Sequence, residues 1–307
     1  MLLNRLILAS VLFASTLIQA QEKTDTSKAD NNTILPDGYT AQLDVVYTSG
    51  TGWDKKMDIY LPPKSGKPTP VIIHFHGGAW VSGVKESQMN GIKFGFKNYL
   101  QEGYAIANVE YRMTHEAKAP AAVEDARCAL IYIIKNAKEL NIDINKIVVA
   151  GGSAGAHLAM IAGLLGDDHR FDANCPGVNN IKVAAIIDRW GINDVWAWAY
   201  CCKSHSAQNW LDTRKKDEAY AKSLSPITYV TKNSPPMFIV HGDADSTVPY
   251  EQSVILHKKL VDLGVKTQFI SVPGGGHGKF TVEQMNDVNK SIIEFIKSLD
   301  VFKKVNI

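Results

Sequence analysis

The sequence predicts an α/β fold built on one mostly parallel sheet with helices on both faces, and three observations lead to this prediction. Short apolar runs alternate with stretches of helical periodicity through most of the chain, and strands that alternate with helices form parallel sheets covered on both sides. Runs such as Val71–Phe75 lack polar alternation, which is typical of strands buried on both faces. Several runs end in glycine-containing loops, and loops at the carboxyl ends of parallel strands meet at one edge of the sheet.

The first two predicted strands form a hairpin at an edge of this sheet. Polar and apolar residues alternate in Ala41–Thr48 and Lys56–Leu61, on either side of a turn at Gly50–Gly52, as in antiparallel strands. Pro120 opens a long helix with apolar residues at helical spacing, and Gly264 ends another. The remaining expected elements are strands Val71–Phe75, Tyr104–Val109, Ile147–Ala150, Lys182–Ile187, Met237–His241 and Lys266–Val272, and helices that begin near Ala154 and span Tyr250–Leu263 and Thr281–Leu299.

An insertion of about residues 193–233 interrupts the alternation of strands and helices. Four of the six tryptophans lie within Trp190–Trp210. These rings either form a small satellite core or belong to a partial lid that lines a pocket, since pockets favour aromatic walls carried on loops. Both interpretations can hold for different rings.

Composition and the N-terminal segment limit the class of protein. The 307 residues are 45% apolar and 21% charged, with a formal net charge of +2 and no basic block, which argues against nucleic-acid binding. Residues 1–20 are typical of a signal peptide, with Arg5, the apolar run Leu6–Ile18 and Ala20 before the cut. We therefore expect a secreted or periplasmic protein with no integral membrane segment after cleavage, a polar leader at 21–39 and one domain at 40–307.

The segment Lys146–Ala159 contains the most informative motif of the chain. A predicted strand runs into Gly151-Gly-Ser-Ala-Gly155, and a helical pattern follows. This strand–turn–helix context is that of a nucleophile elbow, in which a sharp turn lifts the Ser153 hydroxyl above the sheet. The alternative is a glycine-rich turn whose serine only caps the helix.

The loops after other strands decide between these two interpretations. His76-Gly-Gly-Ala-Trp80, the Asp243/Asp245 loop and His277 each follow a predicted strand, so they should meet Ser153 at one edge of the sheet. A nucleophilic serine needs a base, an acid that orients the base, and oxyanion donors. The chain order Ser, Asp, His is the order of the α/β-hydrolase arrangement.

With these motifs, the chain resembles secreted α/β-hydrolase esterases, similar to hormone-sensitive-lipase-like enzymes and to bacterial feruloyl and acetyl-xylan esterases. The matching stretches include His76–Trp80, Glu110–Arg112, Gly151–Gly155, His241–Tyr250 and Gly274–Gly278. The resemblance implies an α/β-hydrolase fold with a small lid-like insertion. It also implies a catalytic domain at 40–307.

The resemblance further implies a role for each matching residue: Ser153 as nucleophile, Asp245 as acid, His277 as base, and Gly78, Ala79 and Ala154 as donors of the oxyanion hole. Ala79 stands where the lipase-like branch has a third glycine. A side chain at this position narrows the loop, which argues against esters of bulky alcohols as substrates. We expect Trp80 and Trp190 to contact the substrate. Asp243 is the competing acid, more easily explained as a brace of its loop, while His76 is expected to orient its own loop and His157 to be a packing residue.

The expected activity is that of a serine carboxylesterase. It would form an acyl-serine intermediate on short-chain or aromatic acyl esters, either small molecules or polysaccharide-linked esters such as those of plant cell walls. No cofactor is required and no metal-ligand spacing is present. The alternatives are a prolyl-oligopeptidase-like serine peptidase and a non-catalytic binding protein on the same fold. The oligomeric state does not follow from the sequence.

The four cysteines matter because export leads to an oxidising compartment. Cys128 lies in a helical pattern and is expected to be a buried, small apolar residue. A bridge from Cys175 to Cys201 or Cys202 is the pairing we expect if any forms, and four free thiols are the alternative.

Overall fold

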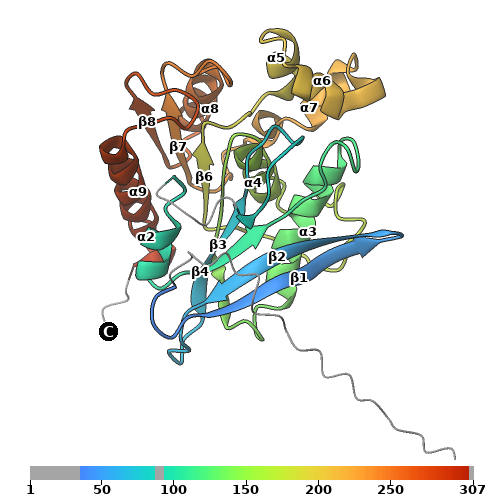
Figure 1. The fold of residues 1–307 in the computed structure, drawn as a ribbon. Coiled ribbons are helices and arrows are strands. Elements are labelled where there is room, and N and C mark those ends of the chain that lie inside the picture. The colour runs from blue at the N-terminus through green and yellow to red at the C-terminus, as the bar shows by residue number, and fades with distance from the viewer. Residues whose placement is uncertain (1–34, 87–92, 304–307) are drawn as a thin grey trace, which may run out of the picture.

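The computed structural model describes residues 35–86 and 93–303 (Figure 1). The predicted signal peptide and leader residues 21–34 lie outside this range. Eight strands form one sheet in the order β1-β2-β4-β3-β5-β6-β7-β8. The pairs β1–β2 and β2–β4 are antiparallel and the other pairs are parallel. The strands are β1 Thr40–Gly50, β2 Trp53–Leu61, β3 Thr69–Phe75, β4 Ala105–Val109, β5 Ile142–Gly152, β6 Ala185–Arg189, β7 Met237–Gly242 and β8 Thr267–Val272.

Helices cover both faces of the sheet, and each face has its own apolar core. Residues such as Ile73 and Val149 face one core, and their sequence neighbours Ile72 and Val148 face the other, as the two-residue period of a strand requires. The first core includes α3 (Ala121–Lys135), α4 (Ala154–Leu164) and α8 (Glu251–Asp262), and the second includes α2 (Phe96–Gln101) and α9 (Val282–Lys297). The predicted mostly parallel α/β architecture is confirmed.

Several boundaries differ from the sequence prediction. Strand β5 starts at Ile142 rather than Ile147. Strand β6 starts at Ala185 rather than Lys182 and continues through Asp188 and Arg189. Both charged side chains are fully buried and have hydrogen-bond partners. The predicted strand ended too early because these two residues are charged. The leader also contributes to the fold, because the Tyr39 hydroxyl donates to the Leu100 carbonyl at 2.7 Å.

The insertion between β6 and β7 consists of short helices that lie together at the upper right of Figure 1. Asp194, Ser204 and Asp217 cap their N-termini by accepting hydrogen bonds from backbone N–H groups. The helices are α5 Val195–Tyr200, α6 His205–Leu211 and α7 Glu218–Ser223, with 3₁₀ turns at Asp212–Arg214 and Pro226–Tyr229; a further 3₁₀ turn, Asp300–Phe302, follows α9. Within the described residues no helix is long and apolar enough to cross a membrane.

The disulfide prediction was wrong. Cys128 on α3 is bonded to Cys175, in the loop between α4 and β6, with Cα atoms 5.4 Å apart. Cys201 and Cys202 are free and exposed. Helix α3 packs beside α4, which brings the loop after α4 onto α3; a helical pattern in the sequence does not distinguish a buried thiol from a half-cystine.

Candidate active site

Strand β5 delivers Ser153 to the edge of the sheet in a strained turn. Ser153 has φ 57° and ψ −124°, a conformation that side-chain-bearing residues rarely adopt. The turn needs glycine on both sides: a Cβ on Gly151 would lie 2.4 Å from the backbone of Gly155, and a Cβ on Gly155 would lie 2.0 Å from the Phe75 carbonyl oxygen. The Ser153 N–H donates to the Arg189 carbonyl at 2.9 Å, so β6 supports the turn. The local geometry is that of the predicted elbow.

Three predicted site residues meet at this turn. His277, in the loop between β8 and α9, has its Nε2 2.9 Å from the Ser153 Oγ and its Nδ1 2.7 Å from the Asp245 Oδ2. Because Nδ1 faces a carboxylate, it carries the hydrogen, and the Nε2 lone pair is directed at the serine hydroxyl. Ser153 can therefore pass its proton to His277 as it attacks.

Asp245 is fixed in its ionised form. Its Oδ1 accepts hydrogen bonds from the N–H groups of Thr247 at 2.7 Å and Val248 at 3.0 Å. Burial alone would raise the pKa of the Asp245 carboxyl, but hydrogen bonds from His241 and His277 outweigh burial and hold that pKa well below its usual range. The side chain is fully buried, whereas that of His277 is 20% exposed. The base therefore faces the surface and its acid lies behind it.

Asp243, the competing acid, lies elsewhere. Its Oδ1 accepts a hydrogen bond from the Gly274 N–H at 2.7 Å, so it ties the loop after β7 to the loop that carries His277. This is the bracing role expected from the sequence, made to the neighbouring loop rather than to its own backbone.

The loop after β3 lies directly beside Ser153. A Cβ placed on Gly77 would be 3.5 Å from the Ser153 Cβ. Gly78, Ala79 and Trp80 all have positive φ, which turns the backbone through a tight bend. Within the part of the chain that the structure describes, the N–H groups of Gly78, Ala79 and Ala154 donate no hydrogen bond. They are available to an oxyanion formed at Ser153.

Residues after β4 hold this loop in place. The Tyr111 hydroxyl donates to the His76 carbonyl at 2.9 Å, and its ring stacks on the His76 imidazole at 4.4 Å between ring centres. His76 Nδ1 bonds its neighbouring Gly77 carbonyl and Nε2 lies 3.1 Å from Glu110. The Thr114 N–H and hydroxyl both donate to the Trp80 carbonyl. His76 thus orients its own loop, as expected.

Trp80 does not occupy the expected substrate-contacting position. Its side chain is fully buried and stacks on Trp210 of α6 at 4.1 Å between ring centres, with an interplanar angle of 12°. His157 and Trp198 pack edge-on against the same ring. Trp80, Trp198 and Trp210 belong to the first apolar core, together with α3, α4 and α8, so these rings do not form the separate satellite core that was one of the two interpretations of the insertion.

Trp190 has a different environment, next to the proposed base. It is almost fully buried, and its ring lies edge-on to His277 at 6.4 Å and to Phe280 at 5.2 Å. The Lys93 ammonium lies 5.5 Å from the Trp190 ring centre. Trp190 supports the His277 loop rather than presenting an open face to a ligand.

Sequence reasoning missed His241. It is fully buried at the end of β7, and its Nε2 lies 3.1 Å from the same Asp245 Oδ2 that bonds His277. It stands in the stretch His241–Tyr250 that carried the family resemblance, but a single histidine at a strand end has no spacing that predicts such a contact.

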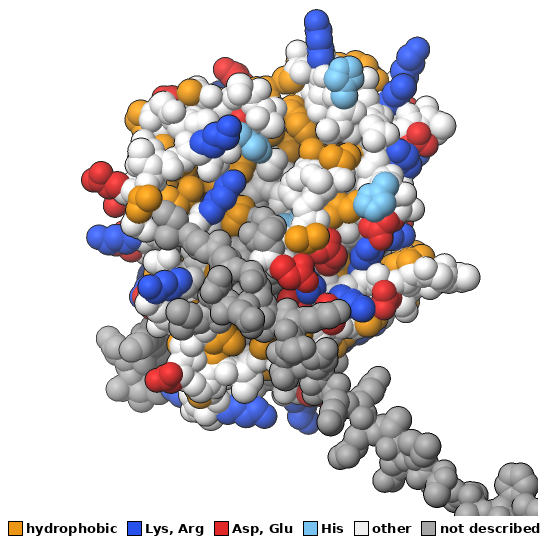
Figure 2. All heavy atoms as spheres, viewed as in Figure 1, with side chains coloured by type: hydrophobic (Ala, Val, Ile, Leu, Met, Phe, Trp, Pro, Cys, Tyr) orange, Lys and Arg blue, Asp and Glu red, His pale blue; other side chains and the backbone are white. Residues whose placement is uncertain are grey.

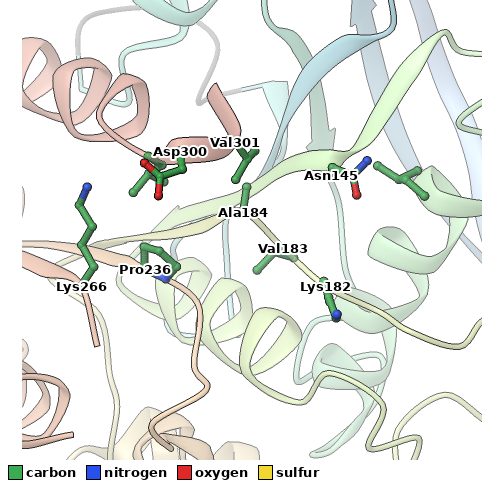
Figure 3. A pocket seen from close by; sticks show the side chains of 10 residues that line it. Asn145, Lys182, Val183, Ala184, Pro236, Lys266, Asp300 and Val301 are labelled. Atoms are coloured by element: carbon green, nitrogen blue, oxygen red, sulfur yellow. The ribbon is translucent and has the colours of Figure 1, made fainter. Parts of the chain in front are cut away.

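Two other surface features do not compete with this site. Charged side chains of both signs are scattered among hydrophobic ones over the face in Figure 2, and nowhere in residues 35–86 and 93–303 do three His, Cys, Asp or Glu side chains gather as metal ligands. Figure 3 shows a hollow lined by Asn145, Lys182, Lys266 and Asp300 among others. Its volume is about 470 Å³. These residues precede or begin strands β5, β6 and β8 or follow α9, at the end of the strands away from Ser153.

Comparison with known proteins shows the family of the chain. The profile of the BD-FAE family matches residues 57–260. The chain belongs to the BD-FAE family. A carbohydrate esterase from gut microbiota, solved in truncated form, shares 29% identity with this BD-FAE member, with a TM-score of 0.70 over 86% of this chain and 100% of that one. Apo Thermogutta terrifontis esterase 2 shares 25% identity with a TM-score of 0.72, over 88% and 97% of the two chains.

The fold is therefore the α/β-hydrolase fold. Among curated proteins, esterase LipC of Mycobacterium tuberculosis is 29% identical over 219 residues, which is 69% of this chain and 53% of LipC. The chain spans about half the length of the curated relatives it matches first.

Proposed function

We propose that the protein is a serine carboxylesterase that hydrolyses short-chain or aromatic acyl esters through an acyl-serine intermediate. One observation carries the proposal: the unbroken hydrogen-bond chain from Ser153 through His277 to Asp245. It lies beside backbone N–H groups that are free in the described residues. Membership of the BD-FAE family and the esterase names of its relatives support the same activity.

The geometry gives each residue a step. His277 removes the Ser153 proton as Oγ attacks the ester carbonyl, and the N–H groups of Gly78, Ala79 and Ala154 stabilise the oxyanion. His277 then protonates the leaving alcohol, and an acyl group remains on Ser153. Water, deprotonated by His277, attacks that acyl group and releases the acid. Asp245 stays ionised throughout and stabilises the imidazolium.

The substrate class rests on the insertion and on one relative. Helices α5, α6 and α7 have 6, 7 and 6 residues, too short for the long amphipathic lid that an enzyme acting at a lipid surface would use. The gut-microbiota relative is a carbohydrate esterase by name. We propose esters of small or polysaccharide-linked alcohols as substrates, met by an exported protein outside the cytoplasm.

Activity-based labelling and a substrate panel test the proposal together. A fluorophosphonate should modify Ser153 alone, as peptide mass spectrometry would show, because only an activated serine reacts. His277→Ala should abolish labelling without unfolding the protein. Acetyl, butyryl, decanoyl and feruloyl esters are then compared with peptide amides. Cleavage of amides without ester hydrolysis, or labelling of a serine other than Ser153, would overturn the proposal.

A further inference from the structure

Two histidines share one oxygen of Asp245. His277 Nδ1 lies 2.7 Å from the Asp245 Oδ2, and His241 Nε2 lies 3.1 Å from the same atom. His241 Nε2 is also 3.0 Å from the Val248 carbonyl oxygen, and its Nδ1 is 2.7 Å from the Ser253 Oγ on α8. His241 is fully buried, so it has no access to substrate.

These contacts fix the proton on His241. Nε2 faces a carboxylate and a carbonyl, which only accept hydrogen bonds, so Nε2 carries the hydrogen. Ser253 Oγ, which can donate, faces the other ring nitrogen. His241 therefore donates to Asp245. Its own position is fixed by strand β7 and by the contact with Ser253 on α8, and not by the reacting groups at Ser153.

We propose that His241 is a positioning residue for the ester hydrolysis proposed above. Asp245 Oδ1 is already held by two backbone N–H groups, and His241 adds a fixed donor to Oδ2, the oxygen that orients His277. Without that donor, Oδ2 is held only by the residue it must orient. The same donor withdraws electron density from the Asp245 carboxylate and so weakens the electrostatic effect of Asp245 on the neighbouring ring.

A test of the role of His241 must account for the other groups that surround its ring. Asp188 on the neighbouring strand β6 interacts electrostatically with His241, the Tyr250 ring of α8 lies edge-on at 5.8 Å, and Asp245 comes from the loop after β7. Of these, only Asp245 contacts His277. An effect of His241 on the reaction must therefore pass through Asp245.

Two amide substitutions separate positioning from packing. His241→Gln places an N–H near the former Nε2 and retains the contact with Asp245. The shorter His241→Asn retains only the contact with Ser253 and loses the one with Asp245. We expect His241→Asn to lower kcat about tenfold with KM unchanged and to raise the acid-limb pKa of kcat/KM by about half a unit or more. His241→Gln should restore most of kcat and most of the pKa.

His74→Gln is the matched control. His74 is also a buried strand histidine whose ring bonds a side chain, Asn108, but it has no contact with Asp245. The His74→Gln substitution should lower the thermal stability of the protein and leave the acid-limb pKa of kcat/KM at the wild-type value. Equal kcat and pKa changes in all three variants would show a packing role only and overturn the proposal.

A double-mutant cycle closes the argument. In an Asp245→Asn background, His241→Asn should have no further effect on kcat, because its route to His277 is gone; full additivity would overturn the proposal. If His241→Asn does not fold, Ser253→Ala should lower kcat in the same direction by a smaller factor, and an unchanged kcat and pKa there would overturn it. Loss of the proposed function itself is distinguishable, since the wild type would then hydrolyse no ester.

Discussion

Removal of the Cys128–Cys175 bridge should destabilise the protein without disabling its active site. The bridge joins residues 47 positions apart. Loop-closure entropy for a loop of this length corresponds to about 4 kcal/mol of stability at 25 °C. For a domain of this size, 1 kcal/mol shifts the melting temperature by roughly 2–4 °C, so the variant carrying Cys128→Ala and Cys175→Ala should melt about 10 °C lower.

The position of the bridge explains why activity should survive. It ties the loop after α4 to α3, in the apolar core on the face of the sheet that these two helices cover, and it includes none of Ser153, Asp245 or His277. Thermal unfolding gives the stability change, and KM at 25 °C should equal that of the wild type.

Thiol counting tests the bridge itself. Alkylation of the native, non-reduced protein should modify only Cys201 and Cys202, and reduction should expose two further thiols. Four thiols that react without reduction would show that the bridge is absent, and an unchanged melting temperature in the double variant would show that it does not stabilise the fold. Because Cys201 and Cys202 are exposed, the variant carrying Cys201→Ala and Cys202→Ala is the control and should melt like the wild type.

Further predictions concern the site and its buried acids. Ser153→Ala should reduce turnover by about 10⁶ with the fold intact; retention of a tenth of wild-type activity would exclude Ser153 as nucleophile. Asp245→Asn should lower kcat by about 10⁴ through the wrong histidine tautomer, and Asp243→Asn should act mainly on thermal stability, so the reverse ranking would reassign the acid. Burial raises the pKa of Asp188 to about 6, so its contribution to stability is complete below about pH 4 and is lost as pH rises through 6. Asp188→Asn should thus gain up to about 3 kcal/mol over the wild type at pH 8 and almost nothing at pH 4, as measured by urea unfolding. Finally, hydrolysis rates should not jump when a substrate passes its solubility limit, because no long lid helix covers the site in the described residues.

The site was predictable where local patterns and topology agree. Gly151–Gly155 requires a sharp turn, and the steric contacts of both glycines are those of an elbow. Asp245 and His277 could be chosen because each follows an apolar run that forms a buried parallel strand, and such strands deliver their loops to one edge.

The rest depends on packing between segments remote in sequence. The Cys128–Cys175 bond needs the path of the loop after α4, and no periodicity in the sequence encodes it. Trp80 follows the same rule: it was expected to contact the substrate, but Trp210, 130 positions later, covers it. His241 was missed because its role depends on a contact with one particular atom, the Oδ2 of Asp245.

The stack of Trp80 on Trp210 has a consequence for how this scaffold can change. Trp80 belongs to the loop that offers N–H groups beside Ser153, and Trp210 belongs to the insertion. Apolar contact between two large buried rings couples the two segments energetically. The insertion is therefore not an exchangeable module: a replacement taken from another esterase would have to bring its own flat aromatic partner for Trp80, or leave one face of that ring uncovered and the adjacent N–H groups held only by the residues after β4.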